Sequence, residues 1–309
     1  MTPPAGLIFI GGYGRSGSTL LERLLAGAPG TVAVGELRHV WERGVGNNEL
    51  CGCGMAFREC GFWSAVLDRA FETGQPPRGD VIELWRRVDR IRYVPAMLGA
   101  PSGSQFRADL TTYVALLRRV YAAIREVSGC PIVVDSSKEI ASGVLAALAE
   151  PERMFYLHLV RDPRAVAYSW SRVRRRPEVT GSPSYMPRVG PVQASWQWMQ
   201  RGLAGDLMRR WTPGLLMRYE DLANDPAGQV ARLRVAARLA AWSGPGGDDG
   251  IAGPDPVIHS VAGNPMRFSD GKLRIQLDEA WRVEMRASAR LTTTVLTLPG
   301  LIRYRYRLW

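Results

Sequence analysis

The segment Leu7–Glu22 constrains the fold of this chain more than any other. It reads LIFIGGYGRSGSTLLE, which is a run of apolar residues, a glycine-rich loop and the start of a helix. A buried strand that enters a helix through such a loop presents backbone N–H groups and the positive helix end to an anion. The loop also carries the cation Arg15 and the hydroxyl groups of Ser16, Ser18 and Thr19. The segment therefore predicts an anion-binding loop in an α/β protein.

The same loop is close in sequence to a nucleotide-binding P-loop. Gly12–Thr19 reads G-x-x-x-x-G-S-T, and Ser18 stands where a P-loop has the lysine that reaches the β- and γ-phosphates. Asp135 ends a second apolar run, as the Mg²⁺-binding carboxylate of an NTPase does. A P-loop kinase or NTPase that uses Gly12–Thr19 and Asp135 is therefore one interpretation, although it lacks the loop lysine.

Apolar runs and helical segments alternate along the chain. The runs predict four parallel strands at residues 7–10, 132–134, 155–160 and 215–217. The helical candidates between and after them are residues 18–26, 110–127, 144–149, 194–210 and 227–240. Near-continuous apolar strands that alternate with helices are typical of a sheet covered on both faces. We therefore predict one α/β domain, residues 1–309, with three layers and a central parallel sheet.

Three stretches interrupt this alternation. Residues 41–108 and 177–191 are rich in turn signals, and loops on a rigid sheet commonly surround its site, so we expect both to line a substrate site. Residues 243–256 are rich in Gly, Pro and Asp and predict an exposed loop. Aromatic residues in or beside the first two stretches suit either an apolar pocket or ordinary packing: Trp63, Trp85, Tyr93, Tyr185, Trp196 and Trp198.

A second junction between a strand and a helix lies at residues 157–171, LHLVRDPRAVAYSWS. Arg161 stands at the end of the predicted strand, and Ser169 lies about two turns into a helix that begins near Pro163. The carboxyl ends of parallel strands meet at one edge of a sheet. We therefore expect Arg161 to lie beside the loop that carries Arg15.

These two junctions together resemble the cofactor-binding motifs of PAPS-dependent sulfotransferases, in particular bacterial enzymes that act on small molecules. The resemblance is carried by G-R-S-G-S-T, D-S-S-K and L-V-R-D-P-R, and it covers residues 7–40 and 130–175. It implies a P-loop-like fold, with PAPS as sulfuryl donor and PAP as product. It assigns the 5′-phosphosulfate to the first loop and the 3′-phosphate to the second junction, hence cofactor binding to Gly14, Arg15, Ser16, Gly17, Ser18, Thr19, Arg161 and Ser169.

The resemblance also implies roles for two cations and for a C-terminal loop. Transfer of a sulfuryl group is an in-line displacement that needs positioned positive charge more than covalent catalysis. We expect Arg15 on the bridging oxygen and Lys138 on the sulfuryl oxygens. Arg267 and Phe268 are the best matches to the family loop that covers the adenine and the 3′-phosphate.

An acceptor hydroxyl must lose its proton to a base as it attacks. Glu36 resembles a glutamate of the glycan and tyrosyl-protein branches of the family, and it lies 21 residues after Arg15. A turn at Pro29–Gly30 and an extended return at Val32–Val34 would bring it back to the loop edge of the sheet. His39 is the second candidate. The expected acceptor is a small molecule, such as a specialised metabolite, with a phenolic, sugar or aliphatic hydroxyl.

The charge balance predicts an anionic partner. Forty Lys and Arg residues against 29 Asp and Glu give a formal charge of +11, which suits a phosphate-rich ligand, a nucleic acid or an anionic lipid. The basic run Arg172–Arg176 is typical of a solvated helix face with one or two phosphate contacts. No nucleic-acid module, membrane-spanning run or signal peptide is recognisable. We therefore expect a cytoplasmic protein that binds neither nucleic acid nor membrane, of an oligomeric state the sequence does not indicate.

Three cysteines lie close together in the sequence. Cys51, Cys53 and Cys60 form C-G-C-x6-C, which resembles half of a zinc site with His39 as a conceivable fourth ligand. The spacing is not a usual zinc pattern, and no second C-x2-C is present. We interpret the segment as a structural loop and expect no metal.

Overall fold

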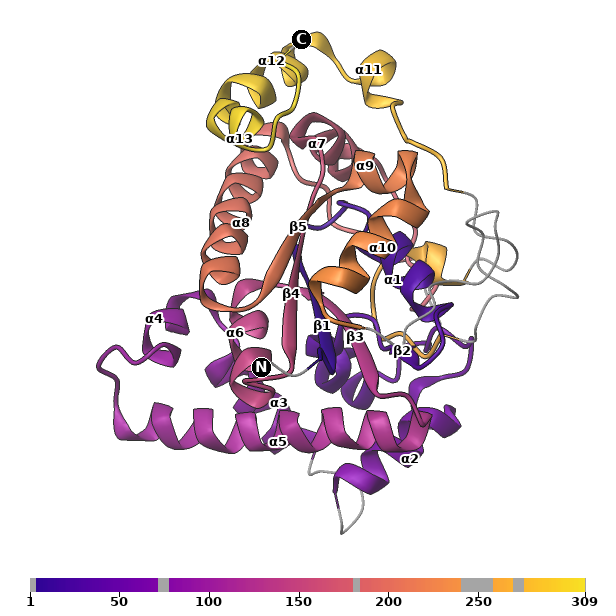
Figure 1. Cartoon of the computed structure of the whole chain (residues 1–309), viewed down its shortest axis with the longest axis vertical. Helices are drawn as coiled ribbons and strands as arrows, with labels where there is room; N and C mark the ends of the chain where they lie inside the picture. Colours follow the sequence, from indigo (N-terminus) through magenta and orange to yellow (C-terminus); the bar gives the residue numbers. More distant parts are fainter. Residues whose placement is uncertain (1–3, 72–77, 180–183, 240–257, 269–274, 309) are drawn as a thin grey trace.

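A parallel β-sheet runs through the middle of the protein in the computed structural model, which describes residues 4–71, 78–179, 184–239, 258–268 and 275–308 (Figure 1). Its strand order is β2–β3–β1–β4–β5, and every neighbouring pair is parallel. The strands are β1 (Leu7–Gly12), β2 (Thr31–Ala33), β3 (Ile132–Lys138), β4 (Met154–Val160) and β5 (Gly214–Arg218). The four predicted strands are confirmed, and the expected extended return forms β2. The loop expected at 243–256 lies outside the described residues.

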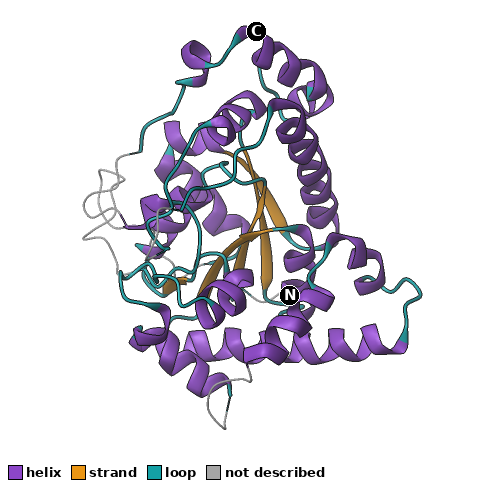
Figure 2. Cartoon of the chain, turned by 180° about the vertical axis from the view of Figure 1, so that it is seen from behind, coloured by secondary structure: helices purple, strands orange, loops and turns teal. Residues whose placement is uncertain are grey.

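Helices cover both faces of the sheet, as Figures 1 and 2 show from opposite sides. One face carries α1 (Ser18–Ala26), α9 (Tyr219–Asn224) and α10 (Pro226–Ala236). The other carries α5 (Ser104–Ser128), α6 (Ile140–Ala149) and α8 (Pro191–Trp211). The predicted α/β fold with three layers is therefore confirmed.

The apolar run of β1 supplies side chains to both cores. Leu7 and Phe9 pack into the core beneath α5 and α6, whereas Ile8 and Ile10 pack into the core beneath α1 and α10. Successive side chains of a strand point to opposite faces, so a strand covered on both sides must be apolar throughout. β1 is central as well as covered, because it pairs with β3 on one edge and with β4 on the other.

Residues 41–108 build a helical layer instead of the irregular insertion that the sequence suggests. Their helices are α2 (Gly61–Ala70), α3 (Arg78–Val88) and α4 (Val94–Met97), with short helical turns η2 (Val40–Gly46), η3 (Phe57–Glu59) and η4 (Ile91–Tyr93). α2 and α3 pack along α5, and Trp63 and Trp85 are buried in the same core. Most of the segment therefore extends the core below the sheet.

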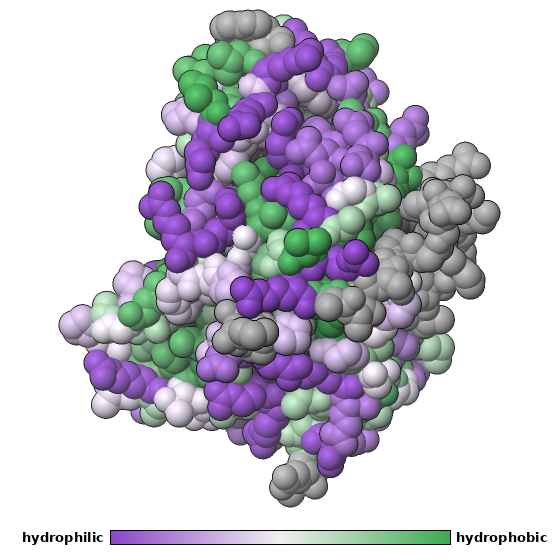
Figure 3. Space-filling model, in the orientation of Figure 1, coloured by the Kyte–Doolittle hydropathy of each residue, from purple (hydrophilic) through white to green (hydrophobic). Residues whose placement is uncertain are grey.

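The remaining helices lie near the carboxyl edge of the sheet and at the C-terminal end of the chain. They are η1 (Leu37–His39), α7 (Pro163–Ser171), η5 (Pro265–Phe268), α11 (Trp281–Glu284), α12 (Ala287–Leu296) and α13 (Leu298–Arg303). Among the described residues, no helix combines the length and the apolar character needed to cross a membrane. Hydrophilic side chains cover much of the face seen in Figure 3.

Gly12, the last residue of β1, provides a test of how tightly the central strands are packed. Its φ is +138°, and an added Cβ would overlap the carbonyl oxygen of Leu159 in β4. A carbonyl held in a sheet cannot move aside, so we expect Gly12→Ala to lower the free energy of unfolding by more than about 3 kcal/mol.

Gly129→Ala is the matched control for this measurement. Gly129 also has a positive φ, 66°, but an added Cβ would meet no described atom within 4 Å. Its expected loss is only the conformational cost of about 1 kcal/mol. Chemical denaturation of both variants measures the difference, and equal losses would contradict the proposed overlap.

Candidate functional site

The carboxyl ends of all five strands border one cavity of about 450 Å³. Residues that follow the strands in order line its wall: Gly14 after β1, Glu36 after β2, Lys138 in β3, Arg161 after β4 and Tyr219 after β5. From β1 the chain turns to β2 and β3 on one side of the sheet and later to β4 and β5 on the other. Such a switch point is where open α/β sheets bind their ligands.

The glycine-rich loop after β1 forms one wall of the cavity. Gly14, Gly17, Ser18 and Thr19 line it, and α1 begins at Ser18 immediately behind the loop. Gly17 has a φ of 91°, and an added Cβ would overlap the ring of Tyr219. The loop therefore needs glycine here to bring its backbone N–H groups and the start of the helix to the cavity.

Two candidate catalytic cations adopt a backbone conformation that costs free energy. Arg15 and Lys138 have φ values of 72° and 67°, in the left-handed region that non-glycine residues seldom occupy. Both line the cavity. A non-glycine residue in the left-handed region costs about 1 kcal/mol or more, and such strain is concentrated at functional sites.

The Arg15 guanidinium is held among other side chains. It stacks 4.9 Å above the Trp170 ring, and Nη2 lies 2.6 Å from Sδ of Met186. Burial and the nearby Arg174 cation lower the pKa of Arg15 to about 10, so it remains charged at neutral pH. The loop thus carries a buried positive charge.

Arg161, which follows β4, and Ser169, in α7, both line the cavity, as their spacing predicts. Arg161 donates to the backbone oxygen of Arg15 at 3.2 Å and forms an ion pair with Asp278 at 3.1 Å. Its guanidinium also lies 4.4 Å from the centre of the Tyr219 ring. The side chain of Asp278 is 43% exposed, so an anionic ligand can displace its carboxylate from Arg161.

Glu36, His39 and Lys138 form a cluster on the opposite side of the cavity. The Nζ atom of Lys138 lies 2.5 Å from Oε1 of Glu36, and Nε2 of His39 lies 3.6 Å from Oε2. Burial alone would raise the pKa of Glu36. The Lys138 ammonium and His39 outweigh this effect and hold the pKa at about 2. Burial lowers the pKa of His39 to about 4. At neutral pH Glu36 is therefore ionised and His39 neutral, and each can accept a proton.

Arg267 and Phe268 do not line the cavity, contrary to the role expected for them. Arg267 is buried, and its guanidinium donates to the backbone oxygens of Ser260 at 2.7 Å and Leu50 at 3.1 Å. Within η5 the Arg267 side chain therefore points toward Ser260 and Leu50. Other residues of the same segment, Gly263, Asn264 and Met266, reach the cavity instead.

Asp135 does not lie on the cavity wall either. Its buried carboxylate accepts hydrogen bonds from the Tyr121 hydroxyl at 2.7 Å and from the Ser137 N–H at 2.9 Å. The first interaction holds β3 against α5, and the second lies within β3 itself. Asp135, the residue that suggested a Mg²⁺-binding NTPase, therefore has a structural role in the core.

The cavity also includes residues that the sequence did not single out. Among them are Tyr13, Trp170, Met186, Gln197, Arg201 and Asp278. The basic run 172–176 was a usable signal, because Arg174 and Arg176 line the cavity. The six aromatic residues left open by the sequence lie elsewhere, so they pack or are exposed, whereas Tyr13, Trp170 and Tyr219 supply the aromatic rings of the wall.

Two solved structures match this fold over almost its whole length. The sulfotransferase domain from the Synechococcus PCC 7002 olefin synthase matches 97% of this chain and 97% of its own, with 21% identity and a TM-score of 0.50. The sulfotransferase domain from the curacin biosynthetic pathway matches 100% of both chains, with 16% identity and a TM-score of 0.51. No family model and no curated protein matches the sequence. The chain thus has the fold of bacterial sulfotransferase domains, and the resemblance predicted from its motifs is confirmed at the level of the fold.

The ion pair between Lys138 and Glu36 can be tested through the pKa of the carboxylate. In Lys138→Met the burial of Glu36 is no longer offset, so we expect its pKa to rise from about 2 to above its ordinary value of 4.5. A ¹³C NMR titration of side-chain carboxyls measures it, with Glu36→Gln identifying the resonance. Arg69→Met, which removes a surface ion pair with Glu126, is the control and should leave Glu36 unchanged. A value near 2 in Lys138→Met would contradict the pairing.

Proposed function

We propose that the protein transfers the sulfuryl group of PAPS to a hydroxyl group of a small-molecule acceptor. The observation that carries this proposal is the set of groups around one cavity: a loop of N–H donors, the separately held cations Arg15 and Arg161, and the ionised Glu36. The fold shared with sulfotransferase domains supports the same class of reaction.

The residues on the wall fit a donor that carries an anion at each end. The Nε atoms of Arg15 and Arg161, which line the cavity, are buried without a hydrogen-bond partner among the described residues. The same holds for the Oγ atom of Ser16, which lies in the loop but not on the cavity wall. Buried donors of this kind are satisfied by phosphate oxygens. In our proposal the loop from Gly14 to Thr19 binds the 5′-phosphosulfate, and Arg161 with Ser169 binds the 3′-phosphate.

PAPS would supply the activated sulfuryl group, and the chain would supply charge and a base. A bond forms between the acceptor oxygen and sulfur as the bond from sulfur to the leaving phosphate oxygen breaks. Arg15 stabilises the negative charge that develops on the leaving oxygen. Glu36 takes the proton of the acceptor hydroxyl, and His39 is the alternative base.

The Lys138 ammonium links donor binding to this base in our proposal. A carboxylate with a pKa of about 2 is a weak base. The ammonium has three N–H donors, and two of them already reach Glu36 at 2.5 Å and the backbone oxygen of Ser136 at 3.2 Å. In our proposal the third donor binds the sulfuryl oxygens and draws the ammonium away from Glu36. As Lys138 turns toward the donor, the burial of Glu36 is less offset and its basicity rises. The base would thus become strong only when the donor is present.

The acceptor would enter between the loop and segment 177–191. Met186 and Pro187 of that segment line the cavity, whereas Arg43 is the only contribution to the wall from residues 41–108 among those described. The two structural neighbours come from an olefin synthase and a biosynthetic pathway, which supports a specialised metabolite as acceptor. The wall near Arg15 combines aromatic and thioether groups, which suit an apolar acceptor.

Binding of PAP without Mg²⁺ tests the donor site. We expect Arg161→Ala to weaken PAP binding by about 10- to 100-fold in calorimetry, because a charge-assisted contact is worth about 1.5–3 kcal/mol. Asp278→Asn is the matched variant, and removal of the competing carboxylate should leave PAP affinity unchanged or higher. Unaltered affinity in Arg161→Ala would remove the 3′-phosphate assignment. Stabilisation by Mg·ATP alone would instead favour the kinase or NTPase interpretation.

Substitution of the base tests the chemical step. Glu36→Gln keeps the shape of the side chain and removes its ability to take a proton. We expect turnover to fall by about 10²- to 10⁴-fold while PAP affinity changes little. Assays of sulfated product in Glu36→Gln and His39→Ala distinguish the two candidates. Near-normal turnover in the first variant and a large loss in the second would assign the base to His39.

A further inference from the structure

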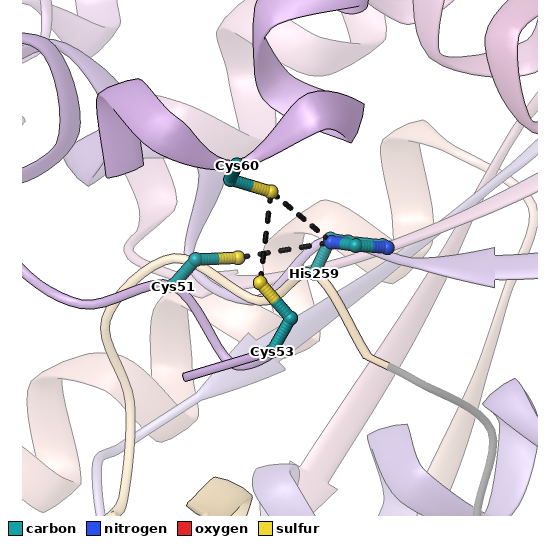
Figure 4. Close-up of side chains that lie close together, drawn as sticks. All are labelled: Cys51, Cys53, Cys60 and His259. Atoms are coloured by element: carbon teal, nitrogen blue, oxygen red, sulfur yellow. Dashed lines mark hydrogen bonds between the residues drawn. The ribbon is translucent and has the colours of Figure 1, made fainter. Parts of the chain in front are cut away.

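Outside the cavity, three thiols converge on one imidazole ring (Figure 4). Cys51 and Cys53 lie in a turn that follows Leu50, Cys60 immediately precedes α2, and His259 lies in segment 258–268. The three Sγ atoms and a ring nitrogen of His259 all lie within 4.8 Å of one another. The sequence interpretation as a structural loop missed this partner, since His259 comes 199 residues after Cys60.

The distances within this cluster are those of ligands around a common atom. Nδ1 of His259 lies 3.2 Å from Sγ of Cys60 and 3.9 Å from Sγ of Cys51, and the Sγ atoms of Cys53 and Cys60 are 3.7 Å apart. Tetrahedral zinc, with bonds of about 2.3 Å to sulfur and about 2.0 Å to nitrogen, separates two sulfurs by about 3.8 Å and sulfur from nitrogen by about 3.5 Å. A disulfide would instead need sulfurs about 2.0 Å apart.

The backbone around the cysteines holds them in this arrangement. The Cys51 N–H donates to Met55 at 2.9 Å, and the Gly54 N–H donates back to Cys51 at 2.9 Å, which closes a tight turn. The Gly52 N–H donates to the oxygen of Ser260 at 3.0 Å, and a side chain at Gly52 would overlap the backbone beside His259. The C-G-C-G sequence is thus shaped to lie against the histidine segment.

The imidazole is held from the other side by α2. The indole N–H of Trp63 donates to the backbone oxygen of His259 at 2.8 Å. The ring of Phe62 stacks on the His259 ring, with centroids 4.6 Å apart. A metal-binding histidine needs such support to fix the orientation of its ring. The ligand set is therefore ordered by contacts that do not involve the thiols themselves.

We propose that Cys51, Cys53, Cys60 and His259 bind one zinc ion. Soft thiolates with one imidazole are a ligand set that zinc prefers, and four protein ligands leave no open position for a substrate. Two of the four ligands are closed to solvent, because Cys51 and Cys60 are each only 1% exposed, whereas Cys53 and His259 are half-buried. Zinc here is structural, and the expectation of no metal made from the sequence is replaced by this proposal.

The zinc ion would join two parts of the chain beside the cavity. Val261, two residues after His259, donates to Val34 at 2.9 Å and accepts from the Glu36 N–H at 2.8 Å. Gly263 and Asn264 then form part of the cavity wall. The ion would thus fix the strand-like segment on which the backbone of Glu36 rests. This inference does not depend on the reaction that the cavity performs.

Metal analysis of the wild-type protein tests the proposal directly. The full chain, expressed with added Zn²⁺ and purified without chelators, should contain about one zinc per chain. Zinc K-edge absorption should show three sulfur ligands and one nitrogen ligand. Removal of zinc by a chelator should lower the thermal unfolding midpoint by more than about 5 °C, and added Zn²⁺ should restore it. Protein that takes up no zinc, or mass spectrometry that finds a disulfide among the three cysteines, would overturn the proposal.

Variants assign the ligands. Cys60→Ser and His259→Ala should lose the zinc, whereas His259→Cys should retain it with four sulfur ligands. Cys130→Ser is the matched control, because the Cys130 thiol contacts the backbone of Ser128 outside the cluster. It should keep both zinc content and stability. Full zinc content in Cys60→Ser would overturn the assignment, and the wild-type measurements decide the matter if that variant does not fold.

Discussion

The arrangement of the whole site depends on one constraint, the burial of β1 on both faces and both edges. All six residues of this strand are buried, and its neighbours β3 and β4 occupy its two sides. The chain leaves this strand at its carboxyl end, where β3 and β4 on either side leave only a narrow space for the backbone. Glycines at 11, 12, 14 and 17 make that passage possible, and the resulting loop lines the cavity immediately before α1 begins.

Excess positive charge around the cavity is balanced by carboxylates at its rim. Lys138 is paired with Glu36, Arg161 with Asp278, and Arg176 with Glu49. Each pair fixes the position of a long, flexible side chain. Because Asp278 is partly exposed, its interaction with Arg161 is weaker than a buried ion pair and can be exchanged for a stronger anion. Three of the cations that line the cavity therefore each have a carboxylate partner.

The sequence predicted the parts of this protein that depend on local pattern. The strands, α1 and the positions of Arg161 and Ser169 follow from apolar runs, loop glycines and the rule that parallel strands end at one edge. The helices of residues 41–108 were missed because turn residues separate segments of only about ten residues, too short for a clear helical period. The inward direction of Arg267 depends on backbone oxygens distant in the sequence, and no spacing rule relates His259 to the cysteines.

The contacts of segment 258–268 have a consequence for the order in which the molecule is assembled. This segment lies against Val34, Gly52 and Trp63, all of which belong to the first quarter of the chain. A ribosome exposes those residues long before it exposes His259. The three thiols and the backbone of Glu36 can therefore form their contacts with segment 258–268 only after that segment has been synthesised. Contacts between such distant residues are slow to form because a long loop must first close. The wall of the cavity is consequently among the last parts of the protein to be completed.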